Sequence, residues 1–202
     1  MKILQLILLG ILLSGCSGLL TSNSDVRYFY VLNPIDDIEV ANKPARIRLS
    51  VQKPLVPDWL DSENIILLRT QNQVDYYAEA RWVSDPSNMI GLIITESLLS
   101  NRVASNIFYD GVEAHADYVL ITEVIAFGAD YNNSDEESPV VHVKMQLRLV
   151  TPLGVPHYQF VVESHTEARA NNMAAIIDAF DDSMEDCLNE IVRKTVHGLN
   201  IK

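Results

Sequence analysis

The stretch "ADYVLITEVIAFGAD", residues 116–130, decides the fold. It is rich in β-branched and aromatic residues, and through its middle apolar side chains occupy both alternating sets of positions. A strand with one face in water alternates apolar and polar residues, whereas a strand covered on both faces does not. Residues 116–130 therefore predict a long central strand, and the segments around it supply the rest of the sheet and the helices.

Two segments after this stretch alternate strictly. Residues 139–150, "PVVHVKMQLRLV", place valine, methionine and leucine on one face and polar side chains on the other, and residues 157–169 repeat the pattern. This alternation is typical of strands with one buried face and one wet face. Upstream, the same reasoning predicts strands at residues 28–32, 45–53, 64–70 and 73–83.

Two segments have helical spacing. Asp85 and Pro86 mark a helix start, because aspartate is a common cap and proline is favoured at the first helical position. Apolar residues then recur at helical spacing, which predicts one helix near 86–101 and, by the same pattern, a second near 172–196. The expected fold is a single α/β (α+β) domain with a mixed, mostly antiparallel sheet.

The chain has 202 residues and a formal net charge of −12, so it lacks the basic footprint of a nucleic-acid-binding protein. Its N-terminus has lysine at position 2 and an apolar run, Ile3 to Leu13, that is too short to span a bilayer. The next residues complete "LSGC", which looks like a bacterial lipobox ending at Cys16. The alternative is a short buried helix that includes a cysteine. We expect a lipoprotein signal peptide at 1–15, a lipidated tether at 16–26 and a periplasmic domain at 27–202.

The residue after Cys16 indicates in which membrane the lipoprotein is anchored. In lipoproteins of this type, an aspartate after the cysteine tends to retain the protein on the inner membrane, and here the residue is Ser17. For a Gram-negative source, Ser17 predicts that the protein bears palmitate and is lipid-anchored on the periplasmic face of the outer membrane. With Cys16 lipidated, Cys187 has no partner for an internal disulfide.

Motifs for catalysis and metal binding are weak. The acidic loop "NNSDEES", residues 132–138, lacks the glycine of a calcium loop. His142, His157 and His165 lie on the predicted outward faces of neighbouring strands and could hold zinc, but no ligand spacing fixes their register. No G-x-S-x-G or H-E-x-x-H motif occurs. We therefore predict no enzyme, no metal and no cofactor.

Aromatic residues near turns have two interpretations. "PLVPDWLDSENIILL" (54–68) and "YYAEARWVSDP" (76–86) place tryptophan and tyrosine beside proline and aspartate. Such side chains are often buried core, but tryptophan and tyrosine also dominate binding hot spots. As candidate partner contacts the sequence indicates Pro57, Asp58, Trp59, Leu60, Tyr76 and Trp82.

These motifs follow one another in a recognisable order. After "YFYVL" come "VPDWLDSENIILL", "VDYYAEARWVSDP", a helix ending "ITESLLSN" and "DYVLITEVIAFGADYNN". Together they resemble the ABC-type transport auxiliary lipoproteins, a family that includes the PqiC (YmbA) intermembrane transport lipoproteins. The resemblance implies a three-layer α/β fold with a mixed sheet. The acidic insertion at 130–138 departs from the family pattern.

The resemblance also implies a function. Family members work beside MCE-type proteins that carry lipid between the inner and outer membranes, and some assemble into homo-oligomeric rings. It implies an outer-membrane-anchored accessory that docks a periplasm-spanning MCE-type lipid transporter. The alternative is an outer-membrane assembly factor or a small-ligand-binding lipoprotein.

Overall fold

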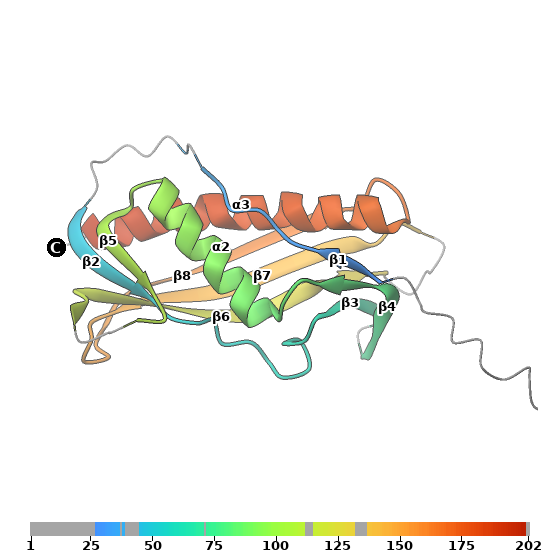
Figure 1. Ribbon diagram of the computed structural model, residues 1–202, viewed down its shortest axis with the longest axis horizontal. Helices are drawn as coiled ribbons and strands as arrows, with labels where there is room; N and C mark the ends of the chain where they lie inside the picture. Colours follow the sequence, from blue (N-terminus) through green and yellow to red (C-terminus); the bar gives the residue numbers. More distant parts are fainter. Residues whose placement is uncertain are drawn as a thin grey trace, which may run out of the picture.

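The computed structural model describes residues 27–200 apart from 37, 39–44, 71, 112–114 and 132–136. Within these residues the chain forms eight strands and two helices (Figure 1). In chain order they are β1 (Tyr28–Tyr30), β2 (Ala45–Val51), β3 (Asn64–Thr70), β4 (Gln73–Trp82), α2 (Pro86–Ser100), β5 (Ala104–Tyr109), β6 (Tyr118–Asp130), β7 (Val140–Val150), β8 (Pro156–Glu167) and α3 (Met173–Asn200).

The long strand β6 organises the sheet, as its sequence predicts. One edge of β6 pairs antiparallel with β7 along its length, and β7 pairs antiparallel with β8. Its other edge is shared: β2 pairs with its beginning and β3 with its end, both in parallel. Between them, Leu55 forms a bridge to Glu123. β4 and β1 extend the sheet beyond β3, and β5 extends it beyond β2.

Both helices pack on the same face of this sheet (Figure 1). α3 lies along β7 and β8, while α2 packs on β5 and contacts α3. A single hydrophobic core joins Ile90 and Ile94 of α2, Phe180 of α3 and Leu120 of β6. α2 packs close to Tyr109 of β5 because Gly91 has no side chain. A Cβ added at Gly91 would lie 2.7 Å from a ring carbon of Tyr109.

The prediction of a single α/β domain with a mixed sheet is confirmed, and so are helices near 86–101 and 172–196. Among the described residues no helix covers the opposite, outer face of the sheet (Figure 1). The reason lies in β7, whose outer residues His142, Lys144 and Arg148 are polar and partly exposed, so they offer no apolar surface to a second helical layer.

Candidate functional site

The segment between β2 and β3 presents Trp59 on the outer face of the sheet. The carbonyl of Pro57 accepts hydrogen bonds from the backbone N–H groups of Leu60 and Asp61, at 2.8 and 3.0 Å, which closes a tight turn. The carboxylate of Asp61 accepts a hydrogen bond from the backbone N–H of Ser87 at the start of α2, at 2.9 Å. The turn is thereby fixed to the helix, and the Trp59 side chain remains 51% exposed.

Strand pairing brings Tyr76 onto the same face. Tyr76 lies opposite Ile66 in the β3–β4 ladder, and Ile66 lines a small cavity of about 150 Å³ together with Trp59 and Gly128. Trp59 and Tyr76 therefore flank the outer side of Ile66. We call the exposed apolar side chains here the outer apolar surface, and it consists of Leu55, Trp59, Val74, Tyr76 and Ile125.

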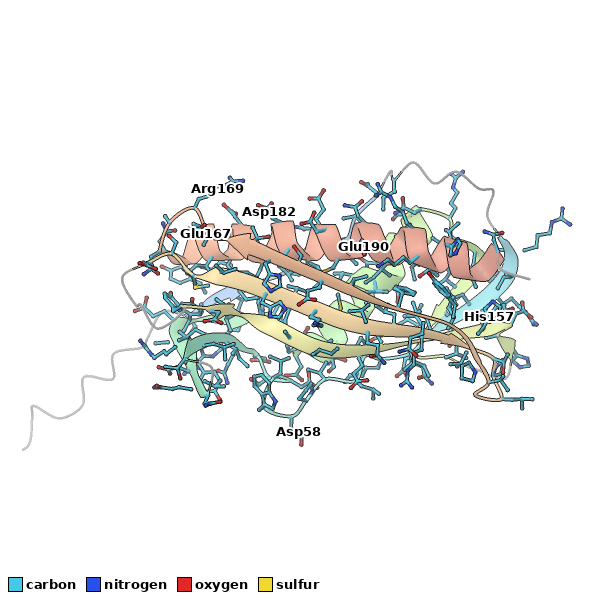
Figure 2. All side chains as sticks on the ribbon, turned by 180° about the vertical axis from the view of Figure 1, so that it is seen from behind. Asp58, His157, Glu167, Arg169, Asp182 and Glu190 are labelled. Atoms are coloured by element: carbon cyan, nitrogen blue, oxygen red, sulfur yellow. The ribbon has the colours of Figure 1, made fainter. Side chains whose placement is uncertain are left out.

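The structure corrects part of the sequence-predicted contact set. Pro57 and Asp58 are exposed, and Figure 2 shows Asp58 at the outer tip of its turn. Leu60 and Trp82, however, are each only 1% exposed. The prediction that these two contact a partner is wrong, because both side chains belong to the hydrophobic core. Trp82 packs against the rings of Phe127 and Phe180, at centroid distances of 5.4 and 5.1 Å.

An aromatic groove that sequence reasoning missed lies beside β1. It has a volume of about 410 Å³ and is lined by Tyr28, Tyr30, Tyr77, Ala78, Glu79, Ala80 and Met173. The Tyr77 hydroxyl donates a hydrogen bond to the Tyr131 hydroxyl at 3.0 Å, which in turn donates to the side chain of Asn171 at 2.9 Å. Burial raises the pKa of Tyr77 above its usual range, so this phenol stays neutral. In the sequence, the signal of this groove is the run "YFY", but that run indicates an ordinary strand equally well.

Two of the three candidate histidines lie side by side, and a glutamate contacts them. His142 lies directly opposite His165 in the β7–β8 ladder, and their rings stack at a centroid distance of 4.1 Å. Glu163 accepts a hydrogen bond from His142 Nε2 at 2.9 Å. His157 is separate, with its Nε2 3.0 Å from the carbonyl oxygen of Gly198. The strand alternation indicates the shared face, but only the register identifies Glu163.

The Cys187 thiol is not a candidate nucleophile. It is 1% exposed, and burial together with Glu190 and Asp186 raises its pKa to about 12. The thiol therefore stays protonated at neutral pH. The other cysteine, Cys16, lies outside the described residues, and its lipidation stays a prediction from the sequence. In the described part of the chain, neither helix is apolar enough over a sufficient length to cross a membrane.

This chain was compared with protein families, with curated proteins and with solved structures. A family model described as ABC-type transport auxiliary lipoprotein component matches residues 30–192. The fold is similar to the crystal structure of a protein from Xanthomonas campestris, with a TM-score of 0.78 and 17% identity, covering 85% of this chain and 95% of that chain. It is also similar to a hypothetical protein from Chlamydia trachomatis, with a TM-score of 0.51 and 10% identity over 77% and 99% of the two chains. None of the curated proteins searched matches the sequence significantly.

Proposed function

Because the chain belongs to the ABC-type transport auxiliary lipoprotein component family, we propose that it is a non-enzymatic accessory of an MCE-type intermembrane lipid transport system. The family is a transport component and not a class of enzyme. In this proposal acyl chains on Cys16 hold the protein on the periplasmic face of the outer membrane. The folded domain then docks the periplasm-spanning MCE-domain protein of the transporter. A homo-oligomeric ring of this chain stays a prediction.

The outer apolar surface carries the proposal. Its five side chains are between 41% and 56% exposed and gather on a face that no described helix covers. Contiguous apolar side chains on a protein surface mark sites where a partner removes them from water. A tryptophan and a tyrosine within such a patch are the residue types that contribute most to binding energy.

The negative charge of the chain indicates which charge its partner carries. The chain has a formal net charge of −12, and exposed Asp58 lies next to Trp59. Acidic side chains around an apolar contact favour a partner with basic residues at the rim of its own contact patch, because opposite potentials speed association and suppress wrong partners. We therefore expect the docking segment of the MCE-domain protein to combine an apolar centre with lysine or arginine at its rim.

The aromatic groove beside β1 supports one alternative, a small-ligand-binding lipoprotein. Its volume of about 410 Å³ falls within the range of small-molecule pockets, and its lining is mainly tyrosine, alanine and methionine. The groove borders Met173 at the start of α3, whereas the outer apolar surface lies on the opposite face of the sheet. Substitutions can therefore separate the two functions.

Replacing Trp59 with alanine is expected to weaken binding to the transporter roughly thirtyfold, which corresponds to about 2 kcal/mol. Because about half of Trp59 is already exposed, the free energy of unfolding should fall by only about 1–2 kcal/mol, well below the loss expected for a fully buried tryptophan. Co-purification of the MCE-domain protein with the variant measures the first effect, and thermal melting measures the second.

Leu153→Ala is the matched control. Leu153 is 92% exposed and lies in the turn between β7 and β8, away from the outer apolar surface. This variant should keep full binding, and so should Met173→Ala, which alters the aromatic groove. A Trp59→Ala variant that still binds fully, or that is destabilised by the about 3–5 kcal/mol of a fully buried tryptophan, would show that Trp59 is not a docking residue.

A further inference from the structure

The outer face of β7 and β8 carries a cluster of metal-ligating side chains. His142 on β7 lies opposite His165 on β8, and Glu163 lies two residues before His165 on the same strand. Residues two apart on a strand point to the same face, so register and alternation together place all three side chains on one side of the sheet. Figure 2 shows His157 near the other end of β8 from Glu167, which keeps it away from this cluster.

The ligand atoms of the cluster converge on a small volume. Glu163 Oε1 is 2.9 Å from His142 Nε2 and 3.9 Å from His165 Nε2, and the three ligand atoms all lie within 4.8 Å of one another. In a tetrahedral zinc site with bonds of about 2.0–2.2 Å, neighbouring ligand atoms are about 3.4 Å apart. The two measured distances fall on either side of that value. The two imidazole rings stack with an interplanar angle of 17°, so binding one ion also requires the rings to rotate out of this stack until both nitrogen lone pairs point at the metal.

We propose that His142, Glu163 and His165 bind one Zn²⁺ ion on the outer face of the sheet, with an open fourth position. Two imidazole nitrogens and one carboxylate oxygen are a ligand set that zinc accepts, and sites with three protein ligands keep the fourth position for water or another donor. The inference depends only on this cluster and is independent of the proposed role in lipid transport.

The neighbouring lysine orients the carboxylate. Lys144 lies opposite Glu163 in the ladder, and its Nζ is 2.9 Å from Oε2. Lys144 thus occupies one carboxylate oxygen and leaves Oε1 facing the two imidazoles. As a nearby positive charge, it also opposes the binding of a cation.

The site borders the outer apolar surface. His142 lines the same small cavity as Trp59, Ile125 and Gly128. A zinc ion held there would therefore lie beside the candidate docking residues. A donor atom from a bound protein could complete the coordination.

Isothermal titration of the purified, detergent-solubilised lipoprotein with zinc chloride tests the proposal. We expect one zinc ion per chain, with binding weakened by about tenfold or more in both His142→Ala and His165→Ala, because each removes a ligand. His115→Ala removes an exposed histidine outside the cluster and should bind like the wild type. Lys144→Gln removes the opposing charge and should bind zinc more tightly.

Cobalt provides a second readout that does not depend on affinity alone. Co²⁺ in place of zinc should give the visible absorption of a four-coordinate ion in the wild type, and Glu163→Gln should lose it while its thermal melting is retained. Equal zinc binding by the wild type and the His142→Ala/His165→Ala double variant would overturn the proposal.

Discussion

A Trp82→Ala variant loses about 3–5 kcal/mol of its free energy of unfolding. The indole is 1% exposed and packs against Phe127 of β6 and edge-on against Phe180 of α3. Its removal leaves a cavity where β4, the central strand and the long helix meet. Typical domains are stable by about 5–15 kcal/mol, so this one change removes a large share of the total. Denaturant unfolding followed by circular dichroism measures the loss.

Trp59→Ala is the control, since it removes the same side chain from an exposed position. Its free energy of unfolding should fall by only about 1–2 kcal/mol, because about half of Trp59 is already exposed. Trp82→Phe should fall between the two, because phenylalanine fills part of the cavity. If Trp82→Ala unfolded like the wild type, Trp82 would not be a core residue and would return to the candidate partner surface.

A Cys16→Ala variant is expected to lose the lipid anchor that the sequence predicts. Each buried methylene of an acyl chain contributes about 0.8 kcal/mol to membrane binding, and stable anchoring requires more than one chain. Without the Cys16 thiol no lipid can be joined at the lipobox, and the signal peptide should remain uncleaved at this site or the protein should become soluble. Palmitate labelling and membrane fractionation in a bacterial host report both effects.

Cys187→Ala is the matched control for this experiment. The Cys187 thiol of α3 is buried against the sheet, with its pKa raised to about 12, so it is no acceptor for lipid. The variant should be labelled like the wild type. Palmitate labelling that persisted in Cys16→Ala would contradict the lipobox interpretation.

The sequence predicts most of the fold because its strongest signals are local. Residues 116–130 predict the central strand, and alternation predicts β7 and β8. The strand β5 has no such signal, because "ASNIFY" lies at an edge of the sheet and has several exposed residues. It forms through long-range parallel pairing with β2. The C-terminal helix extends to Asn200 because buried Val196 and Leu199 continue its apolar stripe.

The candidate site is less predictable because it depends on contacts between residues far apart in the sequence. Trp59 and Trp82 both occur near turn residues, and only tertiary packing decides that the first is exposed and the second buried. Tyr76 faces the outer side because of its register with Ile66. The pairing of His142 with His165 likewise depends on the turn that joins β7 and β8. Alternation identifies a face of a strand, whereas register identifies neighbours.

Site-specific photo-crosslinking in living cells tests the docking surface most directly. A photoreactive amino acid is placed at Trp59, at Tyr76 or, as a control, at Leu153, in cells that carry the transporter. We predict a covalent adduct with the MCE-domain protein from the first two positions and none from the third. An adduct from Leu153 with none from Trp59 or Tyr76 would contradict docking through the outer apolar surface.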